Sequence, residues 1–142
     1  MGLVLDASAT LAWFINRVDK AEARLADEVL RSLQTQEAVV PALWYTEVAN
    51  GVLVAERRGG VDPSKSASFL EKVNFLPIAE DAKRPPASQI TVLTLARVYK
   101  LTAYDATYLE LVLRTGQPLA TFDRQLAEAV RRAGGQVFGD PQ

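Results

Sequence analysis

Short apolar runs alternate with longer helical segments along this chain, and this order most limits the folds open to it. Strands are predicted at residues 3–5, 38–40, 75–79, 118–122 and 136–138. Helices are predicted at residues 8–14, 21–33, 42–58, 62–73, 88–99 and 107–114, and a last helix ends at Gly134 and Gly135. The polar, proline-broken stretch 80–86 is the clearest loop. Such alternation indicates βαβ units, so the expected fold is α/β with a central, largely parallel sheet of short strands.

Some of the helix boundaries carry recognisable signals. Asp62 followed by Pro63 is a capping acid before a first-turn proline, and Ser88 can cap the helix after it. The 142 residues fit one compact domain, with a core expected at about residues 2–138.

Acidic residues stand where apolar runs end or helices have just begun: Asp6, Glu47, Asp105 and Asp123. Asp6 closes the first run, and Glu47 follows the second by less than two helical turns. Asp105 and Asp123 each end the same short phrase, a leucine, two small residues, an aromatic residue and an aspartate. Because ligands bind at the carboxyl ends of the strands in an open α/β sheet, these positions predict one shared pocket.

Helix capping is the plainer explanation for most of these acids. Asp6, Asp105 and Asp123 each precede a predicted helix, where an aspartate is a common N-cap. Glu47 lies inside the helix at 42–58, so capping does not explain it. It shares one side of that helix with Asn50, toward the end where the pocket is expected.

The chain has no histidine and no cysteine. This excludes Ser-His-Asp and Cys-His catalysis, thiolate metal sites, the usual zinc sites and disulfides. With 49% hydrophobic and 23% charged residues, the composition is that of a globular protein. No apolar stretch approaches the roughly 20 residues of a membrane span, and the N-terminus resembles no secretory signal. We therefore expect a cytoplasmic protein without membrane association.

Several carboxylates in one pocket require a cation. Two of them about 4 Å apart repel by ~4 kcal/mol at an effective dielectric constant near 20. Oxygen ligands without histidine or cysteine favour Mg²⁺, or Mn²⁺, and the chemistry expected of such a site is phosphodiester hydrolysis. Ser8, Asn50 and Thr121 are the neutral polar residues nearest the acids. They could orient a carboxylate or a metal-bound water, and as turn or cap residues they are explained equally well.

Four segments resemble the PIN-domain ribonucleases, specifically the VapC toxins of type II toxin–antitoxin systems. They are LVLDAS at 3–8, WYTEVAN at 44–50, LTAYDATYL at 101–109 and PLATFD at 118–123. Their order and spacing carry the resemblance, which runs nearly end to end. It implies a PIN-like α/β/α sandwich around a parallel sheet. It also implies a catalytic Mg²⁺ site formed by Asp6, Glu47, Asp105 and Asp123, with support from Ser8, Asn50 and Thr121.

The same resemblance implies endonucleolytic cleavage of RNA, a homodimer, and inhibition by a cognate VapB-type antitoxin. RNA binding needs cations near the pocket to meet phosphates. By their position in the sequence the candidates are Arg17, Lys20, Arg57, Arg58, Arg114 and Arg124, each also explicable as solvated helix surface. The motifs specify neither the RNA target nor whether one metal ion or two are bound.

Two other functions fit part of the sequence. The opening Asp6-Ala7-Ser8 is similar to that of haloacid-dehalogenase-type enzymes, whose first aspartate is a nucleophile. Ser8, however, stands where those enzymes carry a second acid, and no late strand ends in paired acids. The other possibility is a binding module with the same fold and no catalysis, which would have no need of four carboxylates in one cleft.

Overall fold

A parallel sheet of short strands forms the centre of the computed structural model, which describes residues 2–15, 19–83 and 87–141. The strands are β1 (Gly2–Leu5), β2 (Glu37–Val40), β3 (Ile78–Glu80) and β4 (Leu119–Ala120), in the order β3-β2-β1-β4. In the registers, Leu3 lies opposite Ala38, and Val4 lies opposite Leu119. All these pairings are parallel, so the expected α/β class is confirmed.

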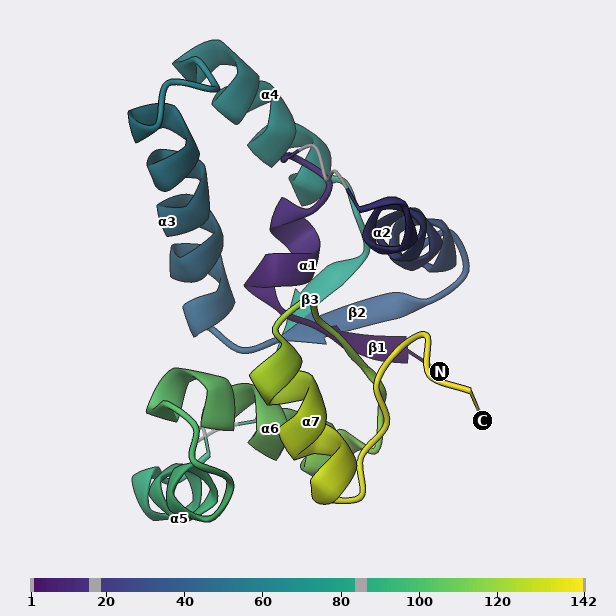
Figure 1. Ribbon diagram of the computed structural model, residues 1–142, viewed down its shortest axis with the longest axis vertical. Coiled ribbons are helices and arrows are strands. Elements are labelled where there is room, and N and C mark those ends of the chain that lie inside the picture. Colours follow the sequence, from purple (N-terminus) through teal and green to yellow (C-terminus); the bar gives the residue numbers. More distant parts are fainter. Residues whose placement is uncertain (1, 16–18, 84–86, 142) are drawn as a thin grey trace.

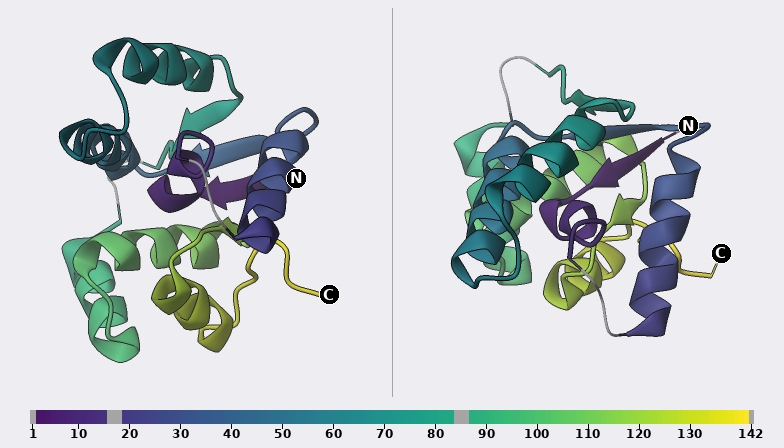
Figure 2. Two further views of the ribbon diagram at one scale, coloured as in Figure 1. Left: turned by 45° about the horizontal axis from the view of Figure 1, so that its top comes forward. Right: turned by 90° about the horizontal axis from the view of Figure 1, so that it is seen from above.

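The helices cover the sheet on both faces. They are α1 (Ala7–Leu11), α2 (Lys20–Ser32), α3 (Leu43–Arg57), α4 (Pro63–Asn74), α5 (Gln89–Tyr99), α6 (Ala103–Thr115) and α7 (Arg124–Arg132). Figure 1 shows α1 to α4 on one side of the sheet and α5 to α7 on the other, and Figure 2 shows the same division from two further directions. The molecule is thus an α/β/α sandwich.

The core lies on both faces of β1. Leu3, Val4 and Leu5 are completely buried, as expected for a strand in the middle of a covered parallel sheet. Helix α6 is the most buried helix, and its Leu109 packs in the same cluster as Leu126 of α7. The carboxyl ends of the strands are therefore held in place by packing on both sides.

The start signals of α4 and α5 act as predicted. The Asp62 carboxylate accepts a hydrogen bond from the Lys65 backbone N–H at 3.0 Å, and the Ser88 hydroxyl accepts one from the Thr91 backbone N–H at 3.1 Å. The bounds of the predicted elements otherwise move by a few residues. Strand β3 begins only after Pro77, whose nitrogen has no hydrogen to donate to a ladder.

The strand expected at residues 136–138 is wrong: this segment forms only an isolated bridge between Leu119 and Val137. The neighbouring strand β4 is only two residues long, and only its Leu119 pairs with this segment. The loop expected at 80–86 begins after Glu80, and residues 84–86 lie outside the described part of the chain. None of the helices in the described ranges combines the length and apolarity that crossing a bilayer requires.

Candidate functional site

Asp6 lies directly after β1 and caps α1. Its Oδ1 accepts hydrogen bonds from the Ala9 backbone N–H at 2.9 Å and from the Ser8 hydroxyl at 2.7 Å. Its Oδ2 accepts a short hydrogen bond from the Thr121 hydroxyl. The residue is only 4% exposed, and this burial raises the pKa of Asp6 to about 6, with a smaller contribution from the charge of Asp123. The capping role expected for Asp6 is therefore confirmed, and the carboxylate that performs it is almost completely shielded from solvent.

Ser8 and Thr121 join the start of the chain to its last quarter. The Ser8 hydroxyl accepts a hydrogen bond from the Phe122 backbone N–H at 2.9 Å, and the Thr121 hydroxyl accepts one from the Asp123 backbone N–H at 3.0 Å. Thr121 lies just beyond β4 rather than within it, so the predicted strand at 118–122 is too long. Both hydroxyls thus hold the Asp6 carboxylate and the loop that carries Asp123 in one arrangement.

Asp123 is half-buried and caps α7. Its Oδ1 accepts a hydrogen bond from the Leu126 backbone N–H at 3.0 Å. Although both residues are described, Arg124 forms no ion pair with it. Its charge instead acts on other acids, since it raises the pKa of both Asp6 and Asp105.

Asp105 lies inside the first turn of α6, so the expectation that it precedes this helix and caps it is wrong. Thr102 is the cap, and its hydroxyl accepts a hydrogen bond from the Asp105 backbone N–H at 3.1 Å. The Asp105 carboxylate therefore does not occupy the cap position. Its pKa is raised by burial first, then by the charges of Asp123 and Glu47, and hydrogen bonding with the Thr102 side chain lowers it in part.

Glu47 is half-buried on α3, and a tyrosine of α6 holds its carboxylate. The Tyr108 hydroxyl donates a hydrogen bond to Glu47 Oε1 at 2.6 Å. Burial raises the pKa of Glu47, and the bond from Tyr108 lowers it again in part. Tyr108 is 1% exposed, and burial and the neighbouring acids Glu47 and Asp6 raise the pKa of its hydroxyl far above the usual range.

Tyr108 was not among the residues expected to support the site. The available signal was its spacing, because a residue three positions after Asp105 lies on the same side of a helix. Asn50 is exposed on α3, three residues after Glu47. Within the described residues it forms no hydrogen bond to any of the four acids.

The four acids are coupled through their charges. Asp6 interacts with Asp123, Asp123 with Asp105, and Asp105 with Glu47. No lysine or arginine in residues 2–15, 19–83 and 87–141 forms an ion pair with any of them. In these same ranges, no three acidic side chains stand close enough together to hold a metal ion as they are. The donor set is all oxygen and suits a hard divalent cation, whose binding would have to draw the side chains inward.

Of the candidate cations, Arg114 is already neutralised. Its guanidinium donates to Glu110 Oε1 at 2.8 Å and also pairs with Asp81. Arg17 lies outside the described residues. Arg57, Arg58 and other exposed cations remain on helix surfaces.

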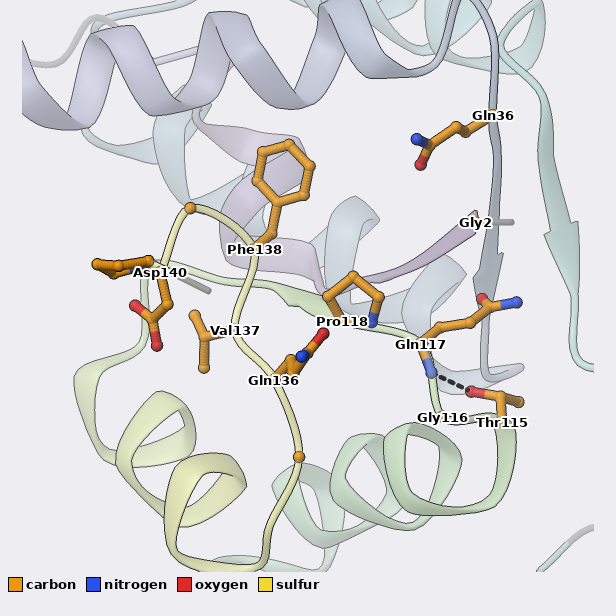
Figure 3. A pocket seen from close by; sticks show the side chains of 13 residues that line it. Gly2, Gln36, Thr115, Gly116, Gln117, Pro118, Gln136, Val137, Phe138 and Asp140 are labelled. Atoms are coloured by element: carbon orange, nitrogen blue, oxygen red, sulfur yellow. Dashed lines mark hydrogen bonds between the residues drawn. The ribbon is translucent and has the colours of Figure 1, made fainter.

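A separate pocket of about 670 Å³ lies near the amino ends of the strands, whereas Asp6 and Asp123 follow their carboxyl ends (Figure 3). It is lined by residues such as Gly2, Gln36 and Gln136 and contains none of the four acids. Its one acid, Asp140, is bound to Arg131 at 2.7 Å. This pocket is therefore separate from the acidic site.

Comparison with known proteins gives matches over most of the chain. The family model described as PIN domain matches residues 3–132. The chain is 31% identical over 140 residues to the protein named Ribonuclease VapC3 of Pyrobaculum aerophilum, covering 90% of this chain and 94% of that protein. It is also similar to the crystal structure of PAE2754 from Pyrobaculum aerophilum, with a TM-score of 0.66 and 26% identity. That match covers 91% of this chain and 86% of the other.

Proposed function

This chain belongs to the PIN-domain family, among its VapC ribonucleases, and we propose that it is a Mg²⁺-dependent endoribonuclease, the toxin of a type II toxin–antitoxin pair. Asp6, Glu47, Asp105 and Asp123 are proposed as the catalytic and metal-binding residues, and Mn²⁺ could replace Mg²⁺. The observation that carries the proposal is the mutual repulsion of these acids with no described cation paired to them. Four carboxylates that repel one another can all stay ionised only when a bound cation offsets their negative charge.

The side chains around the acids have distinct roles in this proposal. Ser8 and Thr121 bind the two oxygens of Asp6 and so orient this carboxylate. Tyr108 binds Oε1 of Glu47 and so orients the carboxylate that would help to hold the metal. A bound divalent ion would lower the pKa of an attacking water and neutralise charge on the scissile phosphate.

The partners are proposed from the family. The VapC relationship supports an RNA substrate and a VapB-type antitoxin as the proposed partners. A homodimer and a cytoplasmic location are proposed with them. A basic side chain of the antitoxin placed among the four acids would substitute for the cation and so inhibit the enzyme.

Conservative substitution of two acids tests the site. Asp105→Asn and Asp123→Asn should each abolish Mg²⁺-dependent RNA cleavage and growth arrest on expression, with the fold kept, because asparagine caps α7 about as well as aspartate. Asp19→Asn is the matched control, since Asp19 is an exposed cap of α2. It should cleave RNA like the wild type.

Several outcomes would contradict the proposal. Cleavage at the wild-type rate by both site variants would show that the residues are wrongly assigned. Absence of RNA cleavage by the wild type, despite binding of an antitoxin, would favour a binding module. A trapped aspartyl intermediate at Asp6 would favour the haloacid-dehalogenase-type alternative.

A further inference from the structure

A groove of about 690 Å³ is lined by residues of the segment after α1, of the end of α3 and of α4. Figure 1 shows that these helices lie on one side of the sheet. The lining of the groove combines aromatic rings with positive charge. We call it the cationic aromatic groove, and its defining residues are Trp13, Phe14, Phe69, Arg58, Lys65 and Lys72.

The aromatic residues form a fixed, half-exposed platform. The rings of Phe14 and Phe69 lie with their centroids 4.6 Å apart and their planes tilted by 31°. Phe69 and Trp13 also pack against the hydrophobic core. The Trp13 indole N–H is held by the carbonyl of Ala26 at 3.0 Å. These rings are therefore positioned by the fold while part of their surface remains open to a ligand.

The charge of the groove has one sign. Arg58, Lys65 and Lys72 are exposed, and no acid is among the residues that line the cavity. Within the described ranges none of these three cations forms an ion pair. Outside the lining, Lys65 interacts with the exposed Asp62 and contributes in small part to lowering its pKa. In a chain of net charge -1, this is a local concentration of positive charge.

Aromatic faces combined with unpaired cations are the features by which proteins bind single-stranded nucleic acid, through base stacking and phosphate contacts. The four acids repel phosphates, so a ribonuclease of this kind needs cations beside its catalytic site. The groove is well placed to supply them, because α1 and α3 also carry Asp6 and Glu47 at their other ends. Along α3, the distance from Glu47 to Ala55 at the groove is about 12 Å.

We propose that the cationic aromatic groove binds single-stranded RNA on one side of the scissile bond. Unpaired bases stack on Phe14 and Phe69, and the phosphates contact Arg58, Lys65 and Lys72. The inference rests on the proposed ribonuclease function and adds to it a substrate subsite outside the four acids. It also predicts that the enzyme prefers unpaired RNA to a duplex, whose stacked bases cannot reach the rings.

Binding should be measured with a fluorescein-labelled, mixed-sequence single-stranded RNA of about 16 nucleotides, in the cleavage-deficient Asp105→Asn background. Adding Lys65→Ala and Lys72→Ala should weaken binding about tenfold or more. It should also reduce the slope of log affinity against log salt by about 1.4, roughly 0.7 for each phosphate that is no longer neutralised. The matched control, Arg24→Ala with Arg97→Ala, removes two exposed cations from α2 and α5 and should have little effect.

The stacking contribution is tested separately. Phe14→Leu keeps an apolar side chain but removes the aromatic face, and should weaken binding about fivefold with an unchanged salt slope. Phe75→Leu is its control, because Phe75 is 83% exposed and lies outside the groove. With the four acids intact, the groove variants should raise KM for RNA cleavage more than they lower kcat.

Different results overturn different claims. RNA cleavage by the wild type with unaltered RNA binding by all groove variants refutes the subsite alone. The subsite is also refuted if the groove variants keep RNA binding but no longer co-purify with the co-expressed antitoxin, which would make the groove a site for an acidic protein segment. A wild type that neither binds nor cleaves RNA refutes the proposed function, and the subsite with it.

Discussion

Asp6→Asn should make the metal-free protein more stable at neutral pH although it removes a proposed catalytic group. Burial raises the pKa of Asp6 from 3.8 to about 6, so ionising this carboxyl group costs more in the folded protein than in the unfolded chain. Because one pKa unit corresponds to about 1.4 kcal/mol, the cost at pH 7 is roughly 3 kcal/mol. Asparagine has the same shape and carries no charge.

The sign of the pH dependence follows from proton binding. Between pH 4 and 6 the folded protein holds the Asp6 proton and the unfolded chain has released it, so the wild type becomes less stable as the pH rises through this window. The variant has no such dependence. Its amide can keep the hydrogen bonds, with Oδ1 accepting from Ala9 and Ser8 and Nδ2 donating to the Thr121 hydroxyl oxygen.

Urea unfolding of both proteins in a chelator, at pH 4 and pH 7, measures the effect. The free energy of unfolding of Asp6→Asn should exceed that of the wild type by roughly 3 kcal/mol at pH 7 and by nearly nothing at pH 4. Asp19→Asn, at an exposed cap, should differ little from the wild type at either pH. Added Mg²⁺ should stabilise the wild type and leave Asp6→Asn unchanged. A variant less stable than the wild type at pH 7, or a difference that is the same at both pH values, would refute the reasoning.

Two further substitutions separate catalysis from stability. Tyr108→Phe removes the hydrogen bond to Glu47, a bond that lowers the Glu47 pKa. The acidic limb of the pH–rate profile should therefore move to higher pH, and kcat should fall about tenfold. An unchanged profile in a folded variant would show that Tyr108 only fills the core. Arg114→Met leaves Asp81 and the 7% exposed Glu110 without their guanidinium and should lower the free energy of unfolding by about 2 kcal/mol, while the cleavage rate of the folded protein stays the same. Denaturant titration and a cleavage assay on the same sample check this, and reduced cleavage at unchanged stability would return Arg114 to the candidates for RNA binding.

Much of the fold was predictable because its signals are local. Asp62 and Ser88 begin helices through bonds to residues three positions away, so their effect is visible in a short stretch of sequence. The segment at 136–138 has strand composition, yet whether it pairs depends on the length of β4, which a local pattern does not determine. Asp105 was misplaced because Thr102 is an equally suitable cap one turn earlier.

The sequence indicated which acids interact through their charges, but it indicated less about the residues that hold them. Parallel strands bring their carboxyl ends to one edge, which places Asp6 after β1 and Asp123 after β4 near each other, whereas Glu47 and Asp105 lie in the early turns of α3 and α6. The bond from Tyr108 to Glu47 joins residues 61 positions apart in the chain. The spacing from Asp105 places Tyr108 on the right side of its helix, but the sequence does not show that its hydroxyl has a partner on another helix.

The bonds that tie Asp6 and Ser8 to Thr121 and Phe122 have a consequence for synthesis. Asp6 is synthesised long before its partners. Its Oδ2 is bound by Thr121, Ser8 is bound by Phe122, and β1 pairs with β4, so these contacts form only after residues 119–122 have been made. An unfinished chain lacking this segment also lacks Asp123. On the proposed function, a ribosome translating this message therefore carries an inactive nascent chain until residues 119–123 have been made. The order in which the fold is completed would protect the translation machinery from its own product until the last part of the domain has been made.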